Sequence, residues 1–517
     1  MVEMTIFHAP LAKQLLSFVN SDPTTFHVPG HHYGRVLQKI ESEIKEQYLG
    51  EYGEEALQYL QAVMRLDTTE LNSTDDLHDP VAAIAEAQQL AAQTFGAEQT
   101  HFLVGGSSAG NIALILATCN PGDTVIVQRN VHKSIINGLK LAGARAVFLM
   151  PQYEPVTNTM TIPSLEQVGE ALRSYPDAKA VLLTNPNYYG IGYRLERWVE
   201  LVHRYHIPLI VDEAHGAHYS LHPLIPSSAL QAGADAVIQS THKTLTALTM
   251  SAMLHLQGTI IDREQVASYL TMIQSSSPSF PQMISLDIAR AIIDIAGEAF
   301  IDRSIKVVDE LVSWIAEHAA YIGVVSDTEV MAETKNCQKD RLRLLLYDQT
   351  GHYSGYQLQQ LFEQDNCWAE MADLTYVVLV VPLGADQGDM DRLKQHIKRV
   401  EYQIKQQLNA SDNIENGSEQ APKVAPQSLV GISISAPVLF ERQKNNAKSM
   451  QMVHLYEAIG KEAAEAIIPY PPGIPIVYEG EVWTNEHYQL VQQYVEVGAK
   501  FQGSKVGNLQ KVKIYDV

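Results

Sequence analysis

From residue 100 onward, short apolar runs alternate with segments that have helical periodicity. The apolar runs are rich in Val, Ile and Leu, which is typical of strands that are buried on both faces of a sheet. These runs fall at residues 101–104, 123–128, 146–150, 179–184, 208–212 and 235–240. Helical patterns separate them, for example over 111–119 and 132–143. The alternation predicts an α/β fold with a mostly parallel central sheet and helices on both faces.

The flanking segments have different patterns. Pro80 opens a helical pattern that is rich in Ala and Gln and ends near Gly96. Beyond residue 285 the pattern is helical to about residue 320, and a smaller α+β region follows with its clearest strands at 341–347 and 375–381. A further helix is expected over 449–466. The chain therefore consists of a large α/β domain followed by smaller parts.

We expect five parts along the chain. The polar segment 409–428 is rich in Asn, Ser, Glu and Pro, which is typical of a linker or a surface loop. The parts are an N-terminal arm and linker (1–70), a large domain (71–305), a small α+β domain (306–408), a flexible linker (409–428) and a C-terminal domain (429–517).

Composition and charge narrow the classes of function. The chain has 517 residues and a formal charge of −22, which argues against nucleic acid or an anionic membrane as a partner. Its three cysteines are widely spaced and form no CxxC pair, so neither a disulfide framework nor a metal site is indicated. Pro10 and Lys13 interrupt the only candidate signal segment, and we expect a cytoplasmic protein.

Polar side chains follow three of the predicted strands, at the ends where open α/β sheets bind ligands. They are Ser107 and Ser108 after the first strand, Asp212 at the end of the fifth, and Ser240, His242 and Lys243 after the sixth. The loop GGSSAGN (105–111) matches neither the GxGxxG nor the GxxxxGK[ST] signature, which disfavours dinucleotide and P-loop sites. An anion-binding loop, a carboxylate and a lysine together match the needs of a pyridoxal phosphate site.

Each of these residues alone also has an ordinary explanation. A Gly/Ser loop between a strand and a helix is usually only a turn, and Asp212 could cap a helix or pair with an arginine. Lys243 could be a solvated surface residue, and His132 could simply begin a helix. A lysine that forms a Schiff base needs partial desolvation, because only the neutral amine attacks a carbonyl. The combination of residues therefore carries more weight than any single one.

Seven segments together resemble the ornithine/lysine/arginine decarboxylase family of fold-type I pyridoxal phosphate enzymes. The resemblance covers nearly the whole chain, in the family's order and spacing, and its overall shape is closest to the short bacterial branch that includes arginine decarboxylases. The segments are FHVPGH (26–31), DDLH (75–78), GSSAGN (106–111), RNVHKS (129–134), VDEAHGAH (211–218), STHKTLTALTMSAMLH (240–255) and PYPPGIP (469–475). Two features depart from the family pattern, namely His32, where relatives often have lysine, and the polar insertion 409–428.

The resemblance implies a role for each matching residue. Lys243 would hold the cofactor as a Schiff base, and Asp212 would pair with the pyridine nitrogen. His132 would stack on one face of the ring, and Ala214 would pack on the other. The phosphate would be held by Ser107, Ser108, Ser240 and His242. His215 would lie near the substrate, and either it or Lys243 could return a proton to Cα after the loss of CO2.

The implied reaction is decarboxylation of a basic amino acid, with arginine favoured and lysine or ornithine as alternatives. A cationic substrate side chain needs carboxylates at the far end of its pocket, and the sequence does not rank the candidates. They are Asp75, Asp76, Glu213, Glu479 and Glu481. Two rival functions remain open. One is transamination, which would need an arginine such as Arg341 or Arg343 to bind a second carboxylate substrate, and the other is ligand binding without catalysis. The resemblance also implies a homodimer as the minimum assembly.

Overall fold

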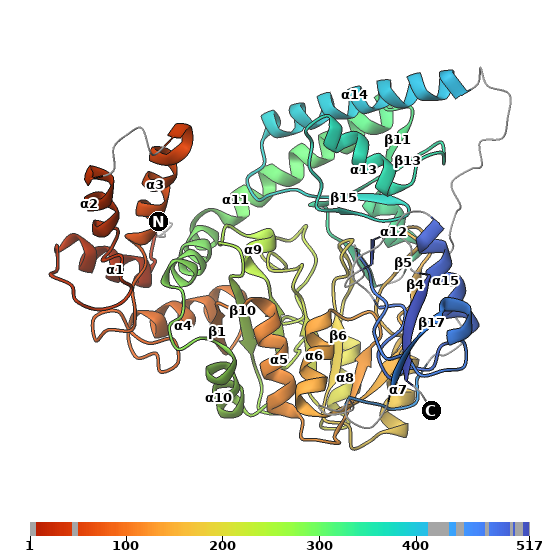
Figure 1. The fold of residues 1–517 in the computed structure, drawn as a ribbon, viewed down its shortest axis with the longest axis horizontal. Coiled ribbons are helices and arrows are strands. Elements are labelled where there is room, and N and C mark those ends of the chain that lie inside the picture. The colour runs from red at the N-terminus through yellow and green to blue at the C-terminus, as the bar shows by residue number, and fades with distance from the viewer. Residues whose placement is uncertain are drawn as a thin grey trace.

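An eight-stranded mixed sheet forms the centre of the computed structural model (Figure 1). The structure describes residues 7–43, 50–334, 336–411, 434–440, 449–470, 475–496, 500–501 and 510–515. In spatial order the strands are β1 (Gln99–Leu103), β10 (Ala252–Leu256), β9 (Ala236–Gln239), β8 (Leu209–Asp212), β6 (Val181–Thr184), β2 (Thr124–Gln128), β3 (Arg145–Leu149) and β16 (Val438–Leu439). The strands from β9 to β3 pair in parallel, which confirms the predicted mostly parallel sheet.

Strand direction brings distant loops to one edge of this sheet. Strand β10 is antiparallel to both β9 and β1, so β1 runs in the same direction as β9. The carboxyl ends of β1, β6, β8 and β9 therefore lie at the same edge. This arrangement positions the loops that follow these strands close together.

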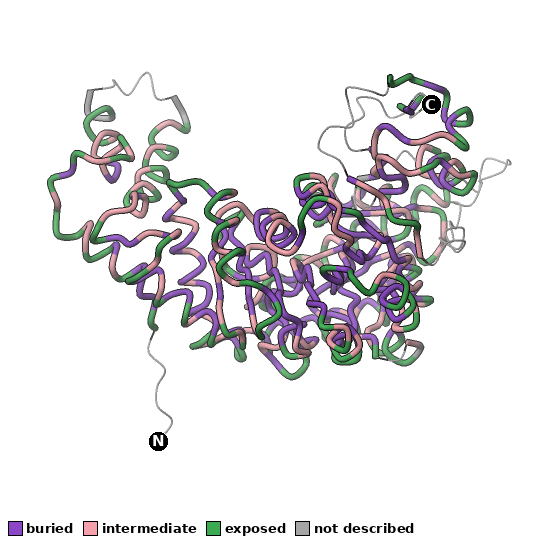
Figure 2. Tube along the Cα trace, turned by 90° about the horizontal axis from the view of Figure 1, so that it is seen from below, coloured by how far each residue is buried: buried purple, intermediate pink, exposed green. Residues whose placement is uncertain are grey.

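Helices cover both faces of the sheet, as predicted. One face packs against α5 (Gly106–Thr118), α6 (Lys133–Ala142) and α10 (Arg263–Ile273). The other packs against α4 (Ala83–Phe95), α7 (Leu165–Ser174), α8 (Glu196–His203) and the start of α11 (Phe280–His318). The expected loop over 105–110 is largely the first turn of α5, and Gly96 ends α4 in a left-handed conformation. Figure 2 shows the buried residues concentrated in this body.

A second, antiparallel sheet lies at the far end of α11. Its order is β11 (Ile322–Val324), β13 (Arg343–Asp348), β15 (Tyr376–Val380) and β14 (Met371–Ala372), which confirms both predicted strands of the small domain. It packs with α13 (Gly355–Gln364) and α14 (Gln387–Ser411), and α12 (Asp327–Glu333) lies nearby. Short pairs complete the fold, namely β4 (Tyr153–Glu154) with β5 (Thr159–Met160), and β7 (Ile191–Tyr193) with β12 (Cys337–Lys339).

The N-terminal arm projects from the body. It holds α1 (Pro10–Asn20), α2 (Arg35–Glu43) and α3 (Gly50–Met64), and Figure 1 shows α2 and α3 side by side at a distance from the sheet. Helix α1 ties the arm to the body, because Asp287 of α11 accepts a hydrogen bond from the Leu11 backbone (2.9 Å). Figure 2 shows that the rest of the arm is mostly exposed or half-buried.

The last part of the chain corrects one prediction. The helix expected over 449–466 is instead strand β17 (Met450–His454), followed by a short 3-10 turn (Leu455–Ala458). Strand β17 pairs with β20 (Lys511–Tyr515), and β18 (Pro469–Tyr470) pairs with β19 (Lys500–Phe501). Helix α15 (Asn485–Glu496) packs on them. Residues 412–428 of the expected linker lie outside the described residues. Among the described helices, none combines the length and apolar content needed to cross a bilayer.

We expect Gly355→Ala to destabilise the small domain, because its new Cβ would lie 2.4 Å from the Tyr376 carbonyl oxygen and 2.6 Å from that of Asp373. Backbone atoms cannot move away as a side chain can, so the expected loss in unfolding free energy is about 2 kcal/mol or more. Chemical denaturation followed by circular dichroism measures it. Gly388→Ala in α14 is the matched control, because there the Cβ meets only the end of the Asp386 side chain. Equal effects of the two changes would contradict the packing argument.

Candidate active site

One cavity of about 260 Å³ lies at the carboxyl edge of the central sheet, where the ends of four strands meet. All nine residues that the sequence singled out line it, namely Ser107, Ser108, His132, Asp212, Ala214, His215, Ser240, His242 and Lys243. They come from four separate loops or helix ends, so only the folded chain brings them together.

At one end of the cavity, donors gather at the first turn of α5. Gly105 and Gly106 lead into this helix, and Gly106 has a φ of +71°. The Ser107 and Ser240 hydroxyls are hydrogen-bonded to each other. The backbone N–H groups of a helix start and the helix dipole favour an anion, and the hydroxyls add further donors. The neighbouring His242 ring is held by a contact of 3.0 Å between Nδ1 and the Ser251 carbonyl oxygen.

Asp212 is a buried carboxylate with a defined orientation. Its Oδ2 accepts a hydrogen bond from Nδ2 of Asn111 (3.0 Å), and its Oδ1 accepts one from the Ala214 backbone N–H (3.2 Å). Asn111 also donates to the Ser134 hydroxyl (3.0 Å). A buried carboxylate with one partner on each oxygen retains acceptor capacity for a further donor in the cavity.

Lys243 follows β9 in a short helical turn, α9 (Thr241–Thr244). Burial lowers the pKa of Lys243, and the carboxylates of Asp212 and Glu370 only partly oppose this effect. Its Nζ lies 3.0 Å from Nε2 of His215. A lowered pKa increases the fraction of neutral amine, which is the nucleophilic form.

His132 is the N-cap of α6, as its sequence position suggested. Its Nδ1 lies 2.9 Å from the Ser134 hydroxyl, and burial lowers the pKa of the ring. The Ser134 hydroxyl thereby contacts both His132 and Asn111. A neutral imidazole held in this way offers a flat, weakly polar face to the cavity.

Several cavity residues were missed by the sequence reasoning. They are Asn111, Thr184, Tyr188, Thr249 and Met250. The position of Thr184 at the end of β6 was a usable signal, because the same argument had already selected Asp212 and Ser240. The Tyr188 ring packs against His215 with centroids 4.7 Å apart. Met250 lies seven residues after Lys243, at the far end of the same loop, and nothing in the local sequence indicates that it lines the cavity.

Glu213 is a structural residue and not a substrate carboxylate. It is fully buried and accepts hydrogen bonds from the Ser228 hydroxyl, the Ala229 N–H and Gln239 Nε2, each at 2.7 Å. Gln239 continues to His255 (3.1 Å), and His255 continues to Thr100 (2.8 Å). Burial raises the pKa of Glu213 to about 7, although these bonds oppose the increase. The chain of bonds runs from Glu213, directly after β8, through β9 and β10 to β1.

The other acidic candidates also have partners within the chain. Asp75 accepts backbone hydrogen bonds from Val81, Ala82 and Ile84. Asp76 accepts one from the His78 backbone. Glu481 is paired with Arg129 at 2.6 Å, and Glu479 is paired with Lys140. Asp75 and Asp76 therefore bind backbone N–H groups of their own loop, and Glu479 and Glu481 form ion pairs within the chain.

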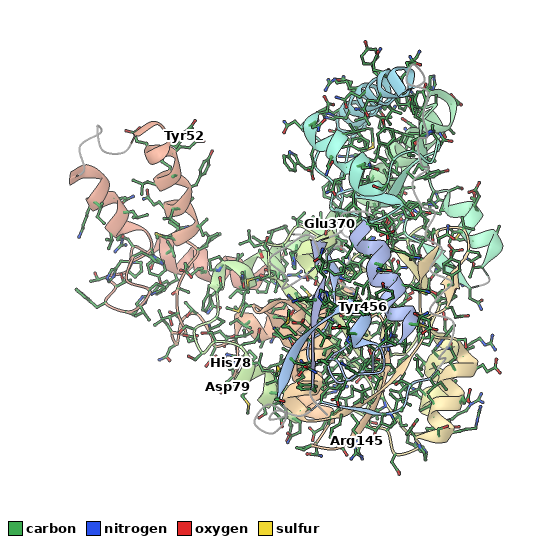
Figure 3. The ribbon with its side chains drawn as sticks, turned by 45° about the vertical axis from the view of Figure 1, so that its right-hand side comes forward. Tyr52, His78, Asp79, Arg145, Glu370 and Tyr456 are labelled. Atoms are coloured by element: carbon green, nitrogen blue, oxygen red, sulfur yellow. The ribbon has the colours of Figure 1, made fainter. Side chains whose placement is uncertain are left out.

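Glu370 is the carboxylate that the sequence reasoning overlooked. It precedes β14 in the small domain, is exposed, and lies near enough to Lys243 to raise the pKa of that amine. Figure 3 shows it near the boundary between the small domain and the body. No described residue forms a hydrogen bond or ion pair with its carboxylate. No motif marks this position, because only the packing of the two domains brings it toward Lys243.

The two arginines that transamination would need have other contacts. Arg341 is paired with Asp309 (3.2 Å) and Asp327 (2.9 Å). Arg343 is fully buried and does not line the cavity. Its Nη2 lies 3.4 Å from Nδ1 of His215. Both guanidiniums therefore already have contacts within the chain.

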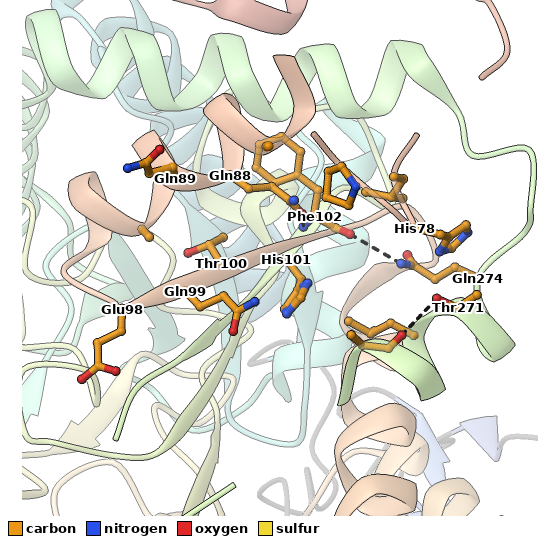
Figure 4. Close-up of a pocket in the computed structure, with 16 residues that line it drawn as sticks. His78, Gln88, Gln89, Glu98, Gln99, Thr100, His101, Phe102, Thr271 and Gln274 are labelled. Atoms are coloured by element: carbon orange, nitrogen blue, oxygen red, sulfur yellow. Dashed lines mark hydrogen bonds between the residues drawn. The ribbon is translucent and has the colours of Figure 1, made fainter. Parts of the chain in front are cut away.

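A larger cavity, of about 360 Å³, lies at the outer side of β1 between α4 and α10 (Figure 4). None of the nine predicted site residues lines it. Gln88 and Gln274 use their side-chain oxygens there to accept hydrogen bonds from the backbone of Phe102 and Val104, each at 2.8 Å. These bonds give partners to backbone N–H groups of β1 and the residue after it, at the edge of the sheet.

Comparison with known proteins agrees with this geometry. The family model for the Orn/Lys/Arg decarboxylase major domain matches residues 9–379, and the model for the family's C-terminal domain matches residues 441–507. The chain belongs to the ornithine/lysine/arginine decarboxylase family. The resemblance inferred from the sequence motifs is thereby confirmed.

Relatives match along almost the whole chain. An arginine decarboxylase of Bacillus subtilis is 30% identical over 99% of this chain and 98% of its own length. The uncharacterized protein YaaO of the same organism is 37% identical over 98% of both chains. Among solved structures, the lysine decarboxylase LdcF of Francisella novicida has a TM-score of 0.78 at 19% identity, covering 99% of this chain and 82% of its own, which shows the shared fold.

Decarboxylases of this family imply pyridoxal phosphate, and the residues of the cavity suit that group. The hydroxyl and N–H donors at the start of α5 match a phosphate, and the buried carboxylate of Asp212 matches a protonated pyridine nitrogen. Lys243 is a partly desolvated amine on the same cavity. The buried Oδ1 of Asn111 and Oγ1 of Thr184 have no partner among the described residues, which leaves polar groups for a ligand to engage.

We expect the stability of the protein to fall between about pH 4.5 and pH 7 because of Glu213. Its pKa is raised in the folded state, so the folded protein binds more protons than the unfolded chain in that range, and stability is lost as the pH rises. The full effect is about 3 kcal/mol. Glu213→Gln should flatten this part of the curve of thermal midpoint against pH, with Glu166→Gln on the surface as control. A parallel curve in the Glu213 variant would contradict the assignment.

Proposed function

We propose that this protein decarboxylates L-arginine to agmatine and CO2 with pyridoxal phosphate bound to Lys243. The observation that carries the proposal is the single cavity in which a desolvated lysine, a buried carboxylate and an anion-binding helix start converge. The match to the Orn/Lys/Arg decarboxylase model gives the reaction class. Four relatives that are 29–30% identical to this chain carry the name arginine decarboxylase, which favours arginine over lysine or ornithine.

Within this proposal, each residue has a physical task. When bound, the cofactor supplies an electron sink that stabilises the negative charge left at Cα by the departing CO2. Asp212 would keep the pyridine nitrogen protonated, and Asn111 holds that carboxylate in place. Ser107, Ser108, Ser240 and His242 would hold the phosphate, while His132 and Ala214 would cover the two faces of the ring. His215, whose Nε2 lies 3.0 Å from Nζ of Lys243, would return the proton to Cα.

The substrate's cationic end needs a carboxylate within reach of Lys243. Among the carboxylates that the structure describes, Glu370 is the one that is exposed, has no described partner and acts electrostatically on Lys243. A charge-assisted hydrogen bond between Glu370 and a guanidinium would orient the substrate. Transamination is disfavoured, because Arg341 and Arg343 are engaged elsewhere.

We also propose a cytoplasmic homodimer as the working assembly. Large apolar side chains are exposed on the N-terminal arm, including Phe26 (93% exposed) and Tyr52 (71%). Figure 3 shows Tyr52 on α3, which projects from the body. Leu248 and Met250 are exposed beside the cavity. A second copy that covers these surfaces would remove apolar area from water and narrow the cavity entrance.

Arginine should release CO2 and agmatine when added to the cofactor-loaded protein, and lysine and ornithine should react more slowly. Lys243→Ala should lose both turnover and the visible absorbance of the bound cofactor, because no other amine lines the cavity. Lys179→Ala, an exposed change two residues before β6, is the control. Turnover that persists without Lys243 would refute its role, and a keto acid product in place of CO2 would refute the reaction class.

Glu370→Gln should lower kcat/KM for arginine by roughly 10- to 100-fold, because a neutral amide replaces the charged partner of the guanidinium. The cofactor's absorbance should not change, since Glu370 lies outside the cofactor cavity. Glu329→Gln, an exposed change on α12, is the matched control. Unchanged kinetics in the Glu370 variant would show that another carboxylate, including one from a second copy, binds the substrate.

A further inference from the structure

His215 is held on three sides. Its Nε2 lies 3.0 Å from Nζ of Lys243, and its Nδ1 lies 3.4 Å from Nη2 of Arg343. The Tyr188 ring packs on its face with centroids 4.7 Å apart and an angle of 57° between the planes. The imidazole is therefore buried between the cavity lysine and an arginine of the small domain, with no freedom to rotate without losing contacts.

Arg343 is anchored in the wall between the two domains. It begins β13, and its carbonyl oxygen accepts a hydrogen bond from Lys339 Nζ (2.8 Å). Gly190, with a φ of +74°, packs so closely that an added Cβ would lie 2.8 Å from the Cβ of Arg343. Asp340, which lies 3.0 Å from Nε2 of the buried His218, provides a negative charge near the guanidinium. The side chain thus approaches His215 in a fixed orientation.

The chemistry of these groups determines which nitrogen of His215 carries the proton. A guanidinium has only donors, so Nδ1 of His215 must act as the acceptor. A neutral imidazole with an acceptor at Nδ1 carries its proton on Nε2. That N–H would donate to Nζ of Lys243, 3.0 Å away, when the lysine is the neutral amine that burial favours.

We propose that Arg343 is a positioning residue that keeps His215 neutral and in the Nε2–H tautomer, facing Lys243. The proposal rests on the proposed function, because it makes His215 Nε2 the group that presents a proton beside the reacting centre. It also assigns a task to a buried arginine that touches neither the cofactor cavity nor the solvent.

The charges around His215 agree with this assignment. Burial and the cations of Lys243 and Arg343 hold the pKa of His215 well below its ordinary value, and His132 and His242 act in the same direction. The carboxylates nearby, Asp212 and Asp340, are already bonded to Asn111 or paired with His218. In the wild-type protein these surroundings therefore all favour the neutral form of His215.

The test is a pH titration of the visible absorbance of the cofactor bound to Lys243, without substrate. Arg343→Gln removes the charge but keeps an amide donor and much of the volume. We expect this variant to show a spectral step at a higher pH than any step in the wild type, because one of the cations that lower the pKa of His215 is gone and the ring, 3.0 Å from the Lys243 nitrogen, gains a proton more readily. Arg343→Lys should remove the step, since it restores the charge. The double change Arg343→Gln with His215→Phe should also lack it.

A titration of Arg343→Gln that matches the wild type would overturn the proposal. An effect on KM alone, without the spectral step, would overturn it as well, because it would indicate that Arg343 binds the substrate carboxylate. If no variant binds the cofactor and the wild type does not either, the proposed function fails, which is a separate outcome.

A second measurement does not depend on whether the Arg343 variants fold. Histidine labelled with ¹⁵N in the cofactor-free protein reports which ring nitrogen is protonated, and the His215 signals are assigned by their loss in His215→Phe. At pH 6.5 we expect a protonated Nε2 and a bare Nδ1. A proton on Nδ1, or on both nitrogens, would overturn the proposal.

Discussion

The site depends on one constraint, which is that polar groups buried at the edge of a sheet must satisfy one another. Strands β1, β6, β8 and β9 point the same way, so the polar residues that follow them converge. Burial would strongly penalise Asp212 or Lys243 alone. Asp212 is stabilised by Asn111, and Lys243 lies against His215. The desolvation that makes burial of these charged groups costly also lowers the pKa of Lys243 and so increases the fraction of reactive neutral amine.

Two buried polar networks support this edge. In one, Glu213, Gln239, His255 and Thr100 form a continuous chain of hydrogen bonds from the end of β8 across β9, β10 and β1. In the other, Arg343 reaches from the small domain to His215. Such networks specify geometry because each member loses a partner if the strands or domains shift. The small domain thereby takes part in the orientation of a residue in the large domain's cavity.

The sequence reasoning was most successful where periodicity and strand ends carry the information. It failed over 449–466, where residues with good helix propensity form β17 and a turn instead. That strand is stabilised by pairing with β20, about 60 residues further along the chain, and local propensity does not contain such a partner. It also began α5 too late, because Gly and Ser have low helix propensity and the stabilising contacts at this helix start are tertiary.

The sequence by itself determined the α/β fold, the order of the sheet-forming segments and the loop positions that supply Ser107, Asp212 and Lys243. These follow from hydrophobic periodicity and from motifs in which neighbouring residues act together. Tertiary structure alone decided that Glu213 is buried, that Glu370 lies toward Lys243, and that Arg343 contacts His215. The physical reason is that these contacts join separate elements: Glu213 bonds to residues 15 to 26 positions away, and the other two contacts join residues more than 100 positions apart, so distance in the chain says nothing about distance in space.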